Sequence, residues 1–157
     1  MTLVIGGVTR CSLCERFLGD SGCVEGFTVF VWNELDPLFG FNDAAFHRSC
    51  LERDPLGKLA IERQADVRRR LGPGSHQCVV CQKAITSWSD NVAFPYLAAD
   101  ENELSEFNYL QFHRGCLPRW PLVASAARLH QAAIGRGQLR GTTFGHLLHE
   151  LENATAR

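Results

Sequence analysis

One four-residue pattern of cysteine and histidine occurs twice in this chain of 157 residues, and it constrains the fold more than any other feature. Each copy has two cysteines separated by two residues, followed by a histidine and a cysteine separated by two residues. The gap between the two pairs is 32 residues in the first copy and 31 in the second. The eight residues are Cys11, Cys14, His47 and Cys50 in the first copy and Cys78, Cys81, His113 and Cys116 in the second.

The two copies agree beyond these cysteines and histidines. Residues 46–56 read Phe-His-Arg-x-Cys-Leu-x-Arg-x-Pro-Leu, and residues 112–122 carry the same residues at these eight positions in the same register. Such self-similarity at a fixed period indicates a duplication. A Gly-Pro-Gly linker at residues 72–74 falls between the repeats. We therefore expect a first zinc-binding repeat over residues 1–72 and a second over residues 73–157, the second with a C-terminal helical extension.

The spacing of these residues predicts two Zn²⁺ sites. Two cysteines separated by two residues bring both sulfurs to one cation when the backbone turns tightly, and a His and a Cys three positions apart share one face of a helix. Four protein ligands close a tetrahedral Cys3His site, so we expect both ions to be structural. The sequence leaves two alternatives open, namely a cross-braced arrangement of the eight ligands and a redox role for the Cys-x2-Cys pairs.

The order of these features resembles the treble-clef zinc fingers, in which a Cys-x2-Cys knuckle is followed by a hairpin and a helix with two more ligands. The resemblance covers residues 10–56 and 77–122. The pattern is also similar to half of a LIM domain, and its spacing resembles the tandem fingers of poly(ADP-ribose) polymerases and DNA ligase III, which recognise DNA breaks. This resemblance implies an α+β fold of two zinc-stapled repeats, each with a knuckle, a β-hairpin and a helix.

Hydrophobic periodicity predicts the elements around the ligands. We expect strands at residues 27–32 and 91–97, and a further strand leading into the histidine of each repeat. A helix is expected over residues 56–71, a second over residues 122–134, and a last one after Gly141.

The charge balance disfavours a polyanion-binding protein. The net charge is -1; residues 1–72 carry 9 basic and 10 acidic side chains, and residues 73–157 carry 7 of each. The chain has no P-loop, dinucleotide-binding fingerprint, nucleophile elbow or zinc-deaminase signature. Because a closed zinc site also lacks a position for substrate, we expect the protein not to be an enzyme.

The leading hypothesis is a non-enzymatic protein-interaction module, an adaptor or inhibitor, of which a bacterial toxin-neutralising immunity protein is one form. The alternative is a DNA- or RNA-binding tandem zinc finger. The candidate contact residues are a tryptophan, an acidic loop and an arginine cluster, namely Trp88, Asp100, Glu101, Glu103, Arg68, Arg69 and Arg70.

No stretch of the sequence is long and apolar enough to cross a bilayer, and no basic segment precedes the short apolar run at the N-terminus. We therefore expect a cytoplasmic protein. The seventh cysteine, Cys23, has Asp90 as its counterpart in the second repeat, and we expect it to be an ordinary thiol outside the metal sites.

Overall fold

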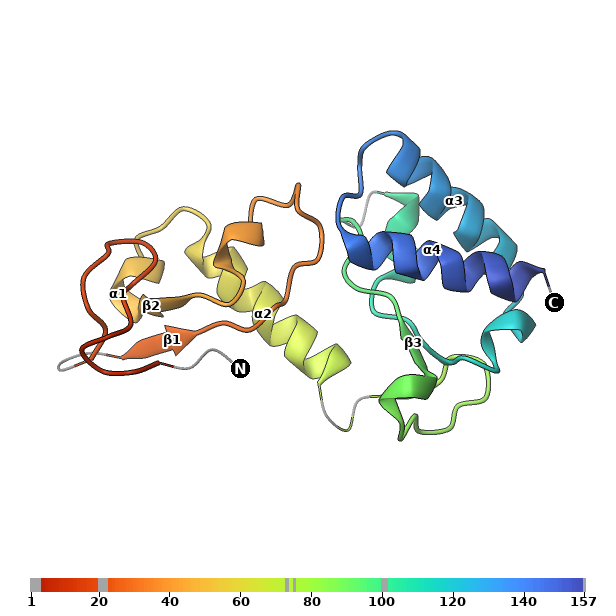
Figure 1. The fold of residues 1–157 in the computed structure, drawn as a ribbon, viewed down its shortest axis with the longest axis horizontal. Helices are drawn as coiled ribbons and strands as arrows, with labels where there is room; N and C mark the ends of the chain where they lie inside the picture. Colours follow the sequence, from red (N-terminus) through yellow and green to blue (C-terminus); the bar gives the residue numbers. More distant parts are fainter. Residues whose placement is uncertain (1–3, 20–22, 73, 75, 100–101, 157) are drawn as a thin grey trace. The chain divides into compact units, whose positions relative to one another are not determined.

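The computed structural model describes residues 4–19, 23–72, 74, 76–99 and 102–156, and the chain divides into two compact units. The fold is α+β, with short antiparallel hairpins and helices (Figure 1). The first unit consists of Met1–Val31 and Asp36–Arg68, and the second of Trp32–Leu35 and Arg69–Arg157.

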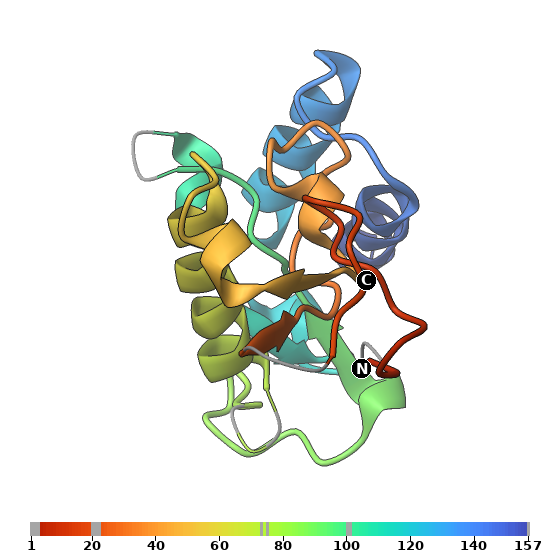
Figure 2. The same cartoon turned by 90° about the vertical axis from the view of Figure 1, so that its left-hand side faces the viewer.

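The first unit is built on the antiparallel hairpin of β1 (Val24–Gly26) and β2 (Ala45–His47). The short 3-10 helix η1 (Phe39–Phe41) lies in the connection between the two strands. Helix α1 (Arg48–Leu51) begins directly after β2, and α2 (Gly57–Leu71) follows it. Figure 2 shows α2 beside the hairpin, where the buried Gln64 on α2 donates a hydrogen bond to the carbonyl of Gly26 at 3.4 Å.

The second unit repeats this hairpin and adds a pair of long helices. Its strands are antiparallel, with Asn91 opposite His113. Helices α3 and α4 pack against each other as a helical hairpin. The elements of this unit are η2 (Trp88–Asp90), β3 (Asn91–Ala93), η3 (Glu103–Phe107), β4 (Gln111–His113), η4 (Leu117–Arg119), α3 (Val123–Gly135) and α4 (Thr142–Thr155).

Each unit has an aromatic core behind its hairpin. In the first unit the ring centroids of Phe27 and Phe46 lie 5.4 Å apart. The equivalent rings of Phe94 and Phe112 lie 5.9 Å apart, and Trp120 packs 4.7 Å from Phe112. All five side chains are buried. Aromatic pairs of this kind contribute about 0.5–1.5 kcal/mol each beyond the area that they bury.

An asparagine in each repeat, Asn42 in the first and Asn108 in the second, holds the loop of the hairpin. Asn42 Oδ1 accepts hydrogen bonds from the backbone N–H groups of Phe30 and Val31 at 3.0 and 3.1 Å, and its Nδ2 donates to the carbonyl of Val31 at 2.6 Å. Asn108 makes the same three bonds to the backbone of residues 97–98, at 2.6, 3.3 and 2.7 Å. One side chain thus satisfies backbone groups that a longer strand pairing would otherwise satisfy.

The strands are shorter than their hydrophobic patterns predict. Residues 27–32 do not form a strand, because the N–H of Phe30 bonds to the asparagine of the loop and the side chains of Phe27 and Phe30 are buried in the core of the first unit. The strand expected over residues 91–97 ends at Ala93. The predicted helices over 56–71 and 122–134 are confirmed with end shifts of one residue, as is the last helix after Gly141.

Candidate metal centres

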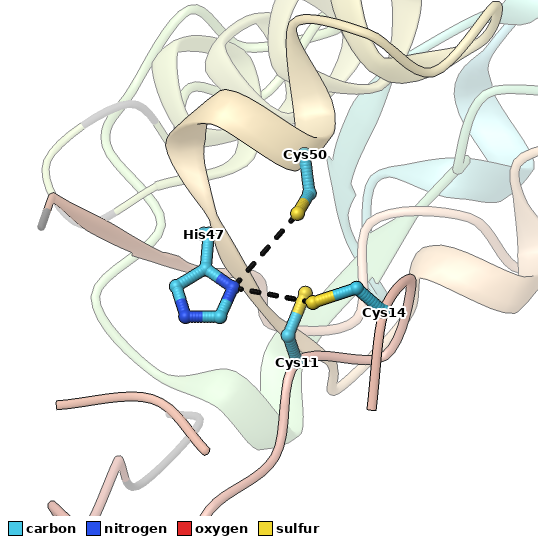
Figure 3. Close-up of side chains that lie close together, drawn as sticks. All are labelled: Cys11, Cys14, His47 and Cys50. Carbon is cyan, nitrogen blue, oxygen red and sulfur yellow. Dashed lines mark hydrogen bonds between the residues drawn. The ribbon is translucent and has the colours of Figure 1, made fainter. Parts of the chain in front are cut away.

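The four ligands of the first repeat converge on one point, as Figure 3 shows. Their ligand atoms all lie within 4.8 Å of one another. The Sγ atoms of Cys14 and Cys50 lie 3.5 and 3.8 Å from Nδ1 of His47. A sulfur and a nitrogen bound to one tetrahedral Zn²⁺ lie about 3.6 Å apart, given the usual zinc–ligand bond lengths. The cluster can therefore hold a metal ion.

The second repeat gathers its four ligands in the same way, again within 4.8 Å of one another. Cys81 Sγ lies 3.4 Å from His113 Nδ1, and the backbone N–H of His113 donates to Cys78 Sγ at 3.4 Å. Each cluster takes all four ligands from its own repeat, so the ligand atoms do not form the cross-braced arrangement.

A tight backbone turn places the first two cysteines of each cluster. The N–H of Cys11 donates to the carbonyl of Arg16 at 2.9 Å, and the N–H of Glu15 donates to the carbonyl of Cys11 at 2.8 Å. The residue after the second cysteine is left-handed in both repeats, with φ of 60° at Glu15 and 59° at Gln82. This turn brings both sulfurs to the same side of the backbone.

The histidine of each cluster is oriented by a backbone carbonyl. His47 Nε2 lies 3.2 Å from the carbonyl oxygen of Phe17, and His113 Nε2 lies 3.3 Å from that of Ala84. A carbonyl oxygen only accepts hydrogen bonds, so Nε2 carries the hydrogen and Nδ1 presents its lone pair to the centre of the cluster. Metal-bound imidazoles have this arrangement, in which the second ring nitrogen donates to a fixed acceptor.

Hydrogen bonds to the sulfurs favour thiolates. The backbone N–H of Arg16 and then its side chain lower the pKa of Cys14 to about 6. Burial raises the pKa of Cys78, but the backbone N–H groups of Cys81 and His113 outweigh this effect and bring it to about 6. Thiolate is the form of cysteine that binds a metal ion. These cysteines are therefore prepared for metal binding near neutral pH.

An arginine contacts the last cysteine of each cluster. Arg119 Nη2 donates to Cys116 Sγ at 3.0 Å, and Arg53 Nη2 donates to Cys50 Sγ at 3.8 Å. Burial is the main cause that raises the pKa of both thiols. A divalent ion held by three thiolates and a neutral imidazole would carry one negative charge, which the guanidinium would offset. Sequence reasoning gave these arginines no role, although both belong to the repeated segment.

The candidate contact residues lie on three separate elements. Trp88, on η2, is 73% exposed. Glu103 is exposed in the first turn of η3. Arg68, Arg69 and Arg70 are exposed on α2. The other two acidic residues, Asp100 and Glu101, lie outside the described residues.

Two further observations concern the rest of the chain. Cys23 is exposed and belongs to neither cluster. Over the described residues, none of the helices has both the length and the apolar character needed to span a membrane.

The sequence matches no protein-family model, and neither the curated proteins nor the solved structures contain a significant match to it.

Proposed function

We propose that both clusters bind Zn²⁺ and that each ion has a structural role. The observation that carries this proposal is the gathering of eight ligand atoms into two groups of four, each within 4.8 Å. Three sulfurs and one imidazole nitrogen are the donor set of structural zinc sites, and they fill a tetrahedron. No position is left for a water or substrate molecule, which supports a non-enzymatic protein.

We further assign each repeat to a treble-clef-like arrangement. Its support is the order of the elements, in which a turn with two cysteines precedes a hairpin whose second strand ends at the histidine. The last cysteine then lies in α1 of the first repeat and next to η4 of the second. A metal ion joins the turn to the helical end, and each unit thereby gains a link that its small hairpin does not provide.

Metal content and coordination test this proposal directly. Elemental analysis of the purified protein should find two equivalents of zinc, and X-ray absorption should find three sulfur neighbours and one nitrogen neighbour per ion. One equivalent of zinc, or an oxygen neighbour that exchanges with solvent, would show that at least one site is absent or open.

The function that we propose for the whole chain is a protein-interaction module, an adaptor or inhibitor. Its near-neutral charge and its exposed apolar side chains support this function. Four of these side chains lie in the N-terminal segment that carries the first cysteine pair, with exposed fractions of 38% to 67%; they are Ile5, Val8, Leu13 and Phe17. A toxin-neutralising immunity protein is the narrowest form of this proposal, and a toxin encoded by the neighbouring gene would be its partner.

A pair of matched variants tests the interaction function. We expect the wild-type protein to recover a protein partner from its native host, and Val8→Asp to lose that partner while both zinc ions stay bound. Leu122→Asp changes a side chain of similar character that is 47% exposed in the second unit, and it should leave recovery unchanged. Equal recovery by both variants would remove the N-terminal segment as the contact surface.

The second candidate function is DNA or RNA binding, and the three consecutive exposed arginines on α2 favour it. Phosphate contacts release counterions, so such binding should weaken steeply with salt. Retention on nicked duplex at moderate salt, lost when Arg68, Arg69 and Arg70 are replaced by Gln, would support this function. Unretained passage of the wild-type protein would reject it.

A further inference from the structure

The second unit contains a small polar pocket that neither metal cluster uses. Its volume is about 40 Å³, which suits a group of a few atoms and is far below the size of ordinary ligand-binding pockets. The pocket lies where η2 meets β3. Its lining residues are His76, Ile85, Thr86, Ser87, Trp88 and Asn91.

A buried glutamine fixes the polarity of this pocket. Gln111 is 4% exposed, and its Nε2 donates to the carbonyl of Arg70 at 2.9 Å. This bond fixes the amide orientation, so Gln111 Oε1 is an acceptor. It accepts from His76 Nδ1 at 2.5 Å and from Asn91 Nδ2 at 3.3 Å. The imidazole hydrogen of His76 is therefore on Nδ1, and its Nε2 is an acceptor, as is Asn91 Oδ1.

Both of these acceptors are buried. Neither His76 Nε2 nor Asn91 Oδ1 has a hydrogen-bond partner within the described part of the chain. Buried polar atoms are normally paired, and leaving an acceptor unpaired is destabilising. The residues that carry these acceptors, His76 and Asn91, both line the pocket, so the unpaired acceptors favour a hydrogen-bond donor as its occupant.

The first repeat forms the same hairpin without this network. At the positions equivalent to the histidine, asparagine and glutamine it has Thr9, Val24 and Ala45. None of these three side chains can reproduce the chain of amide and imidazole bonds. The first repeat therefore forms its hairpin and gathers its ligands without this polar network. The network is a property of the second repeat alone, and a metal cluster of this kind does not require it.

The tryptophan beside the pocket narrows the choice of donor. The Trp88 ring lies 4.7 Å from the His76 ring in an edge-to-face arrangement, yet Trp88 is 73% exposed. An indole attracts a cation and packs against the methylene groups of an extended side chain. A primary ammonium group is a cation with three donors and no acceptor, so it matches both features.

We propose that this pocket binds a primary ammonium group of a partner protein, from a lysine side chain or a free N-terminus. The protein source of the ammonium group rests on the proposed interaction function. The pocket itself does not, because small amines can occupy it in the absence of any partner.

The test is an NMR titration of the full zinc-loaded chain with small amines at a fixed pH. Nα-acetyl-lysine methylamide represents a lysine side chain, and glycine methylamide represents a free N-terminus. We expect saturable shifts of the Trp88 indole N–H and the Asn91 side-chain amide, with millimolar affinity, for at least one of these probes. The probe that binds more tightly identifies the source of the ammonium group, a lysine side chain or a free N-terminus. The same lysine probe acetylated on Nε, and tetramethylammonium, which lacks N–H donors, should produce no saturable shift.

Variants separate this pocket from general surface binding. Asn91→Val introduces the first-repeat residue and should weaken amine binding at least tenfold, while two equivalents of zinc remain bound. Trp88→Ala changes an exposed side chain and should weaken binding even if the first variant folds poorly. Glu152→Gln, an exposed change on α4, is the control and should bind like the wild type.

Several results would overturn this proposal. They are linear shifts with no saturation, an equal response to tetramethylammonium, or wild-type affinity in Trp88→Ala. Amine binding without recovery of a protein partner would reject the interaction function alone. Recovery of a partner without amine binding would reject the pocket alone.

Discussion

At the scale of single residues, the arginine beside the last cysteine of each cluster should strengthen zinc binding. Arg119 donates to Cys116 Sγ at 3.0 Å, whereas Arg53 is 3.8 Å from Cys50 Sγ. Removing a neighbour that supports a metal ligand typically lowers metal affinity about 10–100-fold. We expect Arg119→Gln to weaken zinc binding at the second site by about tenfold, and Arg53→Gln to have a smaller effect at the first.

Competition with a chromogenic chelator measures both affinities. Arg136→Gln removes an exposed arginine after α3 and is the control. Zinc release by Arg119→Gln that equals release by this control would show that the guanidinium does not support the cluster.

A buried histidine should make the second unit sensitive to mild acid. His130 on α3 is 1% exposed, its Nε2 donates to the carbonyl of Phe144 at 3.1 Å, and burial lowers its pKa. An unfolded histidine titrates near pH 6.5. Below about that pH the unfolded chain binds a proton that the folded chain does not, so the free energy of unfolding falls as the pH falls. The slope from one group is at most about 1.4 kcal/mol per pH unit.

Urea unfolding with excess zinc between pH 7.5 and 6 measures this slope. His130→Gln keeps a donor but cannot titrate, so it should show the shallower dependence. Parallel curves for the two proteins would mean that this histidine is not the source of the acid sensitivity.

At the scale of elements, two glycines should respond to alanine in opposite directions. A Cβ on Gly57, at the start of α2, would lie 1.9 Å from the backbone oxygen of Leu51. We expect Gly57→Ala to destabilise the first unit by about 1–3 kcal/mol, because the backbone must shift. Gly145 lies inside α4 with nothing within 4 Å of such a Cβ, so Gly145→Ala should stabilise the second unit by about 0.5–1 kcal/mol.

Chemical denaturation in the presence of zinc compares the two variants. Gly57→Ala should shift the transition of the first unit to lower urea, and Gly145→Ala should shift that of the second to higher urea. A stabilised Gly57→Ala protein would contradict the close approach of Leu51.

The helices could be predicted from the sequence almost to their ends, whereas the strands could be predicted only in part. The strands that lead into the two histidines and the one that begins at Asn91 are present, but the strand expected over residues 27–32 is not. The helices are long enough for a 3.6-residue period to be visible, as in the run that contains Ala60 and Val67. The strands have three residues each, too few for an alternating pattern. What replaces strand pairing is a side chain, Asn42 or Asn108, that bonds to backbone about ten residues away. A single sequence gives no sign of that bond until the two repeats are aligned.

The metal clusters were predictable because their spacing is local and repeated. The residues around the clusters were harder to predict. The arginines lie in the matched segment, but their contact with sulfur depends on side-chain conformation. The polar pocket depends on His76, Asn91 and Gln111, which are far apart in the sequence and lie together only once the hairpin forms. Its only sequence signal was a difference between the repeats.

At the scale of the whole molecule, the two ions should be separable. Structural zinc contributes on the order of 10–16 kcal/mol of apparent binding free energy, whereas a typical domain has a net stability of about 5–15 kcal/mol. We expect Cys50→Ser to reduce zinc to one equivalent and unfold the first unit. Cys116→Ser should do the same to the second, and strong chelation should unfold both.

Zinc analysis and the chemical-shift dispersion of the NMR spectrum measure these changes. Cys23→Ser removes the exposed cysteine outside the clusters and should retain two equivalents. Native dispersion of both units in Cys50→Ser and Cys116→Ser would identify the cysteines as packing residues rather than ligands.

Trp32–Leu35 lies within the first repeat of the sequence but belongs to the second unit, and this affects the order in which the protein folds during synthesis. Asn33 Nδ2 donates to the carbonyl of Gln138, and Asn33 Oδ1 accepts from the N–H of Arg140, so this short segment is fixed by the loop between the last two helices. All four ligands of the first cluster leave the ribosome long before that loop does. The first ion can bind early in translation. Trp32–Leu35, in the middle of the same repeat, can reach its final position only after nearly the entire chain has been synthesised.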